Sequence, residues 1–208
     1  MKVRTLLATI GLGTAVVILA ASATAMAGDG KAVKIGEPAP NFTLTDTTGK
    51  KRSLSEYAGK IVVLEWTNME CPVVERCYKK NTIQETVGHV KKIDKDVVWL
   101  AINSTNHTNN EQNAKWIKRY ELNYPILLDI DGTVGHEYDA RRTPHMFVID
   151  KSGILRYHGA LDSARDDPKP EKPVNYVVNA VQQLAGGETV APYYIKPYGC
   201  SVKYKKTS

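Results

Sequence analysis

The chain has 208 residues, of which 42% are hydrophobic and 24% charged, and this composition is typical of a globular protein. It excludes disordered, collagen-like and coiled-coil proteins, and three cysteines are too few for a small fold held together by disulfides. The net charge of +6 is small and spread along the chain, which argues against a nucleic-acid partner. We therefore expect one globular domain.

The first 27 residues have the features of a secretory signal peptide. Lys2 and Arg4 form a short basic start, residues 5–27 carry no charge, and Ala25-Met26-Ala27 fits the small-x-small pattern of a cleavage site. Cleavage after Ala27 would leave 181 residues with a net charge of +4, exported to the bacterial periplasm or the extracellular space. The alternative is an uncleaved membrane anchor, because the uncharged run is just long enough to span a bilayer.

The hydrophobic pattern of the remaining chain predicts strands that alternate with helices. Strands are expected, in chain order, at 41–46, 50–53, 60–66, 97–102, 126–129, 145–150 and 154–158, and the last two form a hairpin. Helices are expected at 53–56, 72–90, 110–122, 132–138 and 173–185. This order predicts an α/β fold with one central mixed sheet flanked by helices. The domain would cover residues 28–190, and residues 191–208 would form an aromatic and basic tail.

One cysteine occupies a position where thiols become reactive. Cys71 follows the apolar run 60–66, and Pro72 suits the first turn of a helix. A thiol at a helix N-terminus faces free backbone N–H groups and the positive end of the helix dipole, both of which favour the thiolate. The neighbouring carboxylate of Glu70 works in the opposite direction. The simpler alternative is that Cys71 is a small buried apolar residue.

This segment, followed later by Thr143-Pro144 and an apolar strand, resembles the thioredoxin superfamily. The resemblance extends over residues 34–185 and is closest to the redoxin branch, the alkyl hydroperoxide reductase/thiol-specific antioxidant (AhpC/TSA) group. It implies a thioredoxin-like fold with an N-terminal β-hairpin extension, a cis Thr143–Pro144 peptide that lies against Cys71, and no metal or organic cofactor. It also implies that the backbone at Thr143-Pro144 orients the substrate, while Arg141 or Arg142 stabilises negative charge.

Two departures from the family patterns leave the chemistry open. Thioredoxins carry a second cysteine three residues after the first, where this chain has Val74. Peroxiredoxins carry the pattern Pro-x-x-x-Thr-x-x-Cys, in which a threonine stands three residues before the cysteine, where this chain has Asn68. Asn68 is therefore included among the candidate site residues. The substrate could be either a peroxide or a protein disulfide.

The second sulfur must come from elsewhere in the chain. Cys77 follows Cys71 by six residues, which on one helix is a rotation of about 600° and a rise of about 9 Å. Disulfides need Cα atoms roughly 4.4–6.8 Å apart, so a Cys71–Cys77 bond would require the helix to unwind. Cys77 is thus expected to be buried and structural, and Cys200, in a turn-prone tail, is the candidate that resolves oxidised Cys71. A Cys77–Cys200 bridge and a free Cys200 thiol remain as alternatives.

Other titratable residues suggest weaker hypotheses. Cys71, Cys77 and His145 could form a soft metal site, although copper-delivery relatives of this fold space their cysteines differently. Glu65, a carboxylate inside an apolar strand, is either a proton carrier for the thiol or a strand-end residue that faces solvent, and we favour the second interpretation. The histidines at 89, 107, 136 and 158 are expected on the surface or in loops.

Together these features predict an exported thiol-dependent oxidoreductase with Cys71 as nucleophile. Its partners would be a thiol reductant protein and a peroxide or protein disulfide substrate, and dimerisation is left open. The alternative function is a redoxin-fold module that binds partner proteins or handles copper at the cell envelope without catalysis. That alternative predicts a slow, buried Cys71 and an ordered tail that serves as the contact surface.

Overall fold

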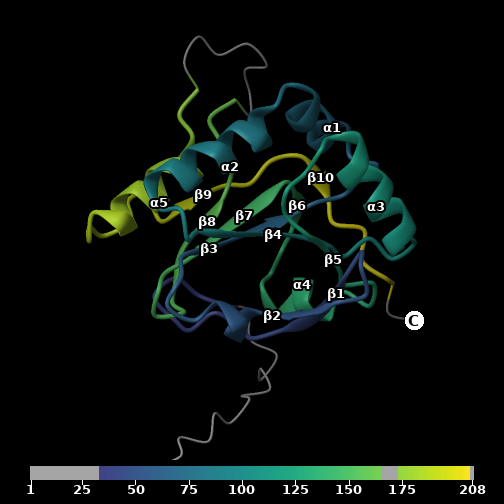
Figure 1. Cartoon of the computed structure of the whole chain (residues 1–208), viewed down its shortest axis with the longest axis horizontal. Coiled ribbons are helices and arrows are strands. Elements are labelled where there is room, and N and C mark those ends of the chain that lie inside the picture. The colour runs from purple at the N-terminus through teal and green to yellow at the C-terminus, as the bar shows by residue number, and fades with distance from the viewer. Residues whose placement is uncertain (1–32, 165–172, 207–208) are drawn as a thin grey trace, which may run out of the picture.

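The computed structural model describes residues 33–164 and 173–206 (Figure 1). The expected signal peptide at 1–27 lies outside the described residues. Among the residues that are described, no helix has both the length and the apolar character needed to cross a membrane.

An eight-stranded mixed sheet forms the centre of the molecule (Figure 1), in the order β2-β1-β5-β4-β3-β7-β8-β9. Strands β3, β4 and β5 pair in parallel, β8 pairs in parallel with β9, and the other neighbours are antiparallel. Their bounds are β1 Thr43–Asp46, β2 Lys51–Ser53, β3 Val62–Trp66, β4 Val98–Asn103, β5 Ile126–Leu128, β7 His145–Ile149, β8 Leu155–Gly159 and β9 Tyr194–Ile195.

Helices cover both faces of this sheet and create two apolar cores. On one face pack α1 (Pro72–Lys79), α2 (Thr82–Ile93), α3 (Asn110–Arg119) and α5 (Tyr176–Ala185). On the other face lie the 3₁₀ helix η1 (Leu54–Tyr57) and α4 (Thr133–Glu137). Alternate residues of β3 enter the two cores, with Val63 on the first face and Leu64 on the second. The site residues at the end of β3 are therefore anchored in packed structure on both sides.

The predicted architecture is confirmed: the protein has a mixed α/β fold with a central sheet flanked by helices. The 145–150 and 154–158 segments form the expected antiparallel hairpin, and the N-terminal hairpin exists. That hairpin is more than an extension, because β1 also pairs with β5 and so widens the main sheet. The single helix expected at 72–90 is wrong. It is two helices, separated where Asn81 adopts a left-handed conformation with φ 58°, which asparagine tolerates better than most residues.

The C-terminal tail is part of the folded structure. It contributes β9, which joins the edge of the main sheet, and β10 (Cys200–Ser201). Strand β10 pairs antiparallel with β6 (Arg142–Thr143) in a separate two-stranded sheet. This pairing brings residue 200 next to residue 143, at the front of the candidate site.

Candidate functional site

Cys71 lies at the junction of β3 and α1. It is the N-cap of α1, with Pro72 at the first helical position, as the sequence predicts. Asn68 shapes the turn before it: the Asn68 side-chain oxygen accepts from the Glu70 N–H at 2.8 Å, and the Asn68 carbonyl accepts from the Cys71 N–H at 3.1 Å. Asn68 therefore positions the cysteine through the backbone. The Cys71 side chain is nearly inaccessible, with 1% exposure.

The Thr143–Pro144 loop lies directly against this cysteine. The Thr143–Pro144 peptide bond is cis, and the Thr143 carbonyl accepts a hydrogen bond from the Cys71 sulfur at 3.2 Å. On its other side Thr143 pairs with Cys200 across the β6–β10 ladder, and its hydroxyl donates to the Cys200 carbonyl at 3.5 Å. Thr143 thus joins the two cysteine-bearing segments.

The two thiols interact, and they are not equivalent. Burial opposes ionisation of Cys71, but hydrogen bonds from the side chains of Cys200 and Thr143 and from the Val74 backbone hold its pKa below the usual value. For Cys200, burial and its contact with Cys71 raise the pKa to about 11. Cys71 is therefore the more readily ionised sulfur of the pair. The thiolate is the form of cysteine that attacks disulfides.

Cys77 belongs to a different environment. It is 5% exposed within the core on the α1 and α2 face, and burial together with the nearby charge of Asp162 raises its pKa to about 12. All three cysteines are free thiols in the structure. The geometry thus separates Cys77 from the Cys71–Cys200 pair.

The two arginines before Pro144 have partners other than the thiol. Arg142 donates from its guanidinium to the Ser201 hydroxyl at 3.0 Å, so it contacts the tail. Arg141 forms an ion pair with Asp139 at 2.7 Å. Stabilisation of a thiolate by Arg142 stays a prediction. The hydrogen bond that Arg142 makes in the structure attaches β10 to β6.

The interpretation of Glu65 as a solvent-facing residue is wrong. Its side chain has 0% exposure and lies among apolar residues on the face covered by α1 and α2. It accepts hydrogen bonds from the Tyr78 hydroxyl at 2.9 Å and the Trp99 indole at 3.0 Å. Burial raises its pKa from 4.5 to about 7, and these two hydrogen bonds offset part of that rise. A group with this pKa can exchange a proton near neutral pH.

His145 and His158 also differ from expectation. His158 is not an isolated surface residue, because its ring stacks on Phe147 and its Nδ1 lies 3.3 Å from His145 Nε2. Burial, with the charges of His158 and Arg141 nearby, lowers the pKa of His145 well below its usual range, so this imidazole is neutral. Across residues 33–164 and 173–206, no three histidine, cysteine or acidic side chains gather in a way that could hold a metal ion.

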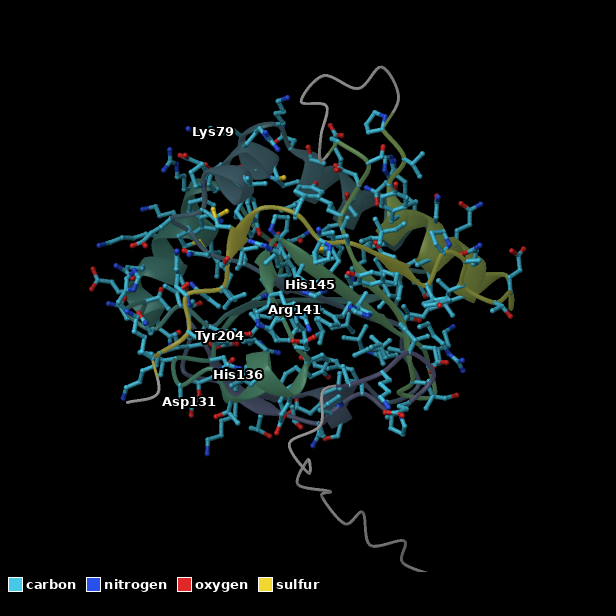
Figure 2. The ribbon with its side chains drawn as sticks, turned by 180° about the vertical axis from the view of Figure 1, so that it is seen from behind. Lys79, Asp131, His136, Arg141, His145 and Tyr204 are labelled. Atoms are coloured by element: carbon cyan, nitrogen blue, oxygen red, sulfur yellow. The ribbon has the colours of Figure 1, made fainter. Side chains whose placement is uncertain are left out.

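Sequence reasoning missed the two tyrosines that fix the tail. Tyr198 is 7% exposed and donates to Asp162 at 2.6 Å, and Tyr204 donates to the Ala140 carbonyl at 2.7 Å. Figure 2 shows Tyr204 next to His136, on whose ring it stacks with a centroid separation of 4.1 Å. The only sequence signal was the aromatic character of the tail.

Comparison with known proteins places this site in a family. The model of the AhpC/TSA family matches residues 35–158, which is more than half of the chain and includes Cys71 and Thr143-Pro144. The chain belongs to the AhpC/TSA family. The family match stops before the tail, so Cys200, Tyr198 and Tyr204 lie outside it.

Two of the curated proteins that this AhpC/TSA member resembles are thiol-disulfide oxidoreductases. The thiol-disulfide oxidoreductase ResA of Bacillus thuringiensis subsp. konkukian is 31% identical over 128 residues, which cover 58% of this chain and 66% of that protein. ResA of Geobacillus kaustophilus is 33% identical over 125 residues, covering 60% and 68%. The chain thus spans about two thirds of the length of these relatives.

A solved structure resembles almost the whole described chain. The crystal structure of an uncharacterized conserved protein from Geobacillus kaustophilus has a TM-score of 0.72 and 26% sequence identity. The similarity covers 84% of this chain and 94% of that one. This AhpC/TSA member therefore shares its fold with that protein over a longer part of the chain than the family model matches.

Proposed function

We propose that this protein is an exported thiol-disulfide oxidoreductase in which Cys71 is the nucleophile and Cys200 the resolving cysteine. The observation that carries the proposal is that two thiols meet at Thr143: the Cys71 sulfur donates to the Thr143 carbonyl, and Cys200 pairs with Thr143 across the β6–β10 ladder. The interaction of the two thiols agrees with these roles, because it lowers the pKa of Cys71 and raises that of Cys200. The similarity to thiol-disulfide oxidoreductases supports a disulfide, rather than a peroxide, as the substrate. Residues 1–27 support export, which the mass of the mature chain, beginning at Gly28, would test.

The site can carry out exchange in two steps. The Cys71 thiolate attacks a partner disulfide, which forms a mixed disulfide and releases one partner thiolate. The sulfur of Cys200, after losing its proton, then attacks Cys71, so that a Cys71–Cys200 disulfide forms and the second partner thiolate leaves. The partner gains two electrons, and a thiol reductant protein must later return two electrons to the Cys71–Cys200 pair. The cis-proline loop orients the reacting sulfurs through the Thr143 carbonyl and the β6–β10 pairing.

A non-catalytic binding module is the second candidate, and two observations favour it. Cys71 is 1% exposed, and the tail is ordered over the site, as that alternative predicts. If the protein is such a module, Cys71 should be alkylated no faster than free cysteine. The lowered pKa of Cys71 and the presence of a second thiol beside it favour the enzyme.

The two candidates are distinguished by peptide mapping under non-reducing conditions. After mild oxidation with oxidised dithiothreitol, we expect a Cys71–Cys200 link in the wild-type chain and none in Cys200→Ser. Cys77→Ala is the matched control, because it removes a cysteine outside the pair and should leave the link intact. An intramolecular disulfide that still involves Cys71 in Cys200→Ser, or fully reduced Cys71 in wild type, would contradict the proposal. In an insulin-reduction assay the Cys71→Ser variant should be inactive.

A further inference from the structure

The tail, yellow in Figure 2, runs across one face of the molecule. Contacts at Tyr198 and Tyr204 hold it on both sides of Cys200. On the inner side, Tyr198 is buried and its hydroxyl reaches Asp162. On the outer side, Tyr204 is only half-buried: its hydroxyl donates to the Ala140 carbonyl and its ring stacks on His136. Asn106 also holds the backbone there, because its side-chain NH₂ donates to the Tyr204 carbonyl at 2.9 Å and its N–H donates to the Lys203 carbonyl at 2.9 Å. The outer attachment is therefore the less buried of the two.

Between these tyrosines the tail backbone lies unusually close to the loop before Pro144. Gly199 has φ +100°, and a Cβ atom at this position would fall on the Thr143 carbonyl oxygen, well inside contact distance. Only glycine permits this approach. It also provides a flexible point between the buried attachment at Tyr198 and the half-buried one at Tyr204.

The closed arrangement is incompatible with attack on a large partner. A partner sulfur must approach the Cys71 sulfur directly. Cys71, however, is only 1% exposed, and β10 is paired with the edge of β6. The same arrangement suits the second step, since it holds Cys200 against Cys71. The two steps of the proposed exchange therefore need two positions of the tail.

We propose, on the basis of the proposed function, that residues 199–206 form a strap that opens at Tyr204 while Tyr198 stays docked. In the open form, an extended cysteine-bearing segment of a partner protein pairs with the edge of β6 that β10 has left, and its disulfide meets Cys71. When the reduced end of the partner leaves, the strap closes and brings Cys200 to the mixed disulfide. The strap is thus both a competitor of the partner segment and the carrier of the resolving sulfur.

The chemical balance is that of the exchange itself. Opening makes and breaks no covalent bond. The Cys71 thiolate breaks the partner disulfide, and closing allows Cys200 to break the mixed disulfide. Two thiols of this chain are oxidised, one partner disulfide is reduced, and the two protons end on the released partner thiolates.

A pair of glycine variants tests the strap in the full reduced chain. Gly199→Ala forces β10 away from Thr143 without altering a side chain that touches either sulfur. Gly187→Ala is the matched control: Gly187 also has a positive φ, of +74°, but a Cβ there meets nothing within 4 Å. The measurements are the rate of Cys71 alkylation by iodoacetamide at pH 7, followed by peptide mass, and hydrogen exchange of the amides in 200–204.

A second pair keeps the test valid if Gly199→Ala folds poorly. Tyr204→Leu removes the outer attachment, and Tyr193→Leu, at an exposed position on the same tail, is its control. Loss of one hydrogen bond and one ring contact should speed alkylation of Cys71 by about tenfold, because alkylation follows the population of the open form. The Gly187 and Tyr193 variants should alkylate at the wild-type rate.

The outcomes separate the strap from the proposed function. The strap is refuted if folded Gly199→Ala and Tyr204→Leu both alkylate at the wild-type rate while wild type still forms the Cys71–Cys200 link. If the variants alkylate faster but wild type forms no such link on oxidation, the proposed function fails and the opening of the strap stands.

Discussion

Replacing Glu65 with glutamine should stabilise the folded protein at alkaline pH and leave its stability almost unchanged in acid. Glu65 is fully buried, and burial is the main cause of the rise in its pKa from 4.5 to about 7. The unfolded chain, in which this carboxyl is solvated, has the ordinary value. Between pH 4.5 and about pH 7 the folded state binds more protons than the unfolded state, so the free energy of unfolding falls as pH rises.

The size of the effect follows from the two pKa values. Below pH 4.5 the carboxyl is protonated in both the folded and the unfolded state, so it does not lower the free energy of unfolding relative to a permanently neutral side chain. Above pH 7 it is ionised in both, and the folded state is destabilised by about 3 kcal/mol relative to a permanently neutral side chain. This figure is an upper value, because water that enters the site would reduce it.

Glutamine can satisfy the same hydrogen bonds. Its amide oxygen can accept from the Trp99 indole, while its NH₂ donates to the Tyr78 hydroxyl, which in turn donates to Tyr124 at 3.0 Å. The variant therefore resembles protonated Glu65 in its charge and in these two hydrogen bonds, and it adds one further amide N–H that the protonated carboxyl does not have. Urea unfolding of the reduced chains from pH 4 to pH 9 measures the difference. Equal stabilities at pH 9, or a gap that widens towards pH 4, would refute the reasoning.

Two further outcomes are expected. Asp46→Asn should show the opposite pH dependence: burial opposes ionisation, but hydrogen bonds from Thr48, Arg52 and the Lys50 backbone lower the Asp46 pKa from 3.8 to about 2. The variant should lose about 2 kcal/mol of stability at pH 7, with the loss shrinking as pH falls through 3.8 towards 2 in urea titrations; a constant loss at every pH would count against it. Cys77, with a pKa of about 12, should stay unlabelled by iodoacetamide at pH 7 in the folded chain and react only in urea, and mass mapping that finds it labelled natively would contradict this.

The sequence predicts the parts of this fold that are set by local pattern. The apolar runs at 60–66 and 97–102 become the parallel pair β3 and β4, because each is long enough to specify a buried strand. The junction of Cys71 and Pro72 is also local, since the proline begins the helix at the expected residue. The helix break at Asn81 had a signal that could have been used, a run of polar residues that ends in Asn-Thr.

The remaining features depend on distant residues. Strands β9 and β10 have two residues each, too few for any periodicity to show, and they form because a neighbouring strand offers a free edge. The environment of Glu65 is made by Tyr78 and Trp99, which belong to α1 and β4, so its burial could not be read from β3 alone. The same holds for Cys200, whose closeness to Cys71 comes from backbone pairing with residue 143.

Val74 occupies the position at which thioredoxins carry their second cysteine, and this explains why the second thiol comes from Cys200. Val74 lies one turn after Cys71, has 0% exposure, and packs in the core that α1 shares with the sheet. The position that holds the second sulfur in thioredoxins is thus occupied by a buried apolar side chain, and Cys77 packs in the same core. The second thiol beside Cys71 comes instead from the side of the Thr143–Pro144 loop, which is the side that the tail covers. In the proposed exchange, oxidation bonds β10 covalently to the site, so the redox state of Cys71 and its accessibility would change together. The oxidised chain would be closed, and reduction would be the condition for opening.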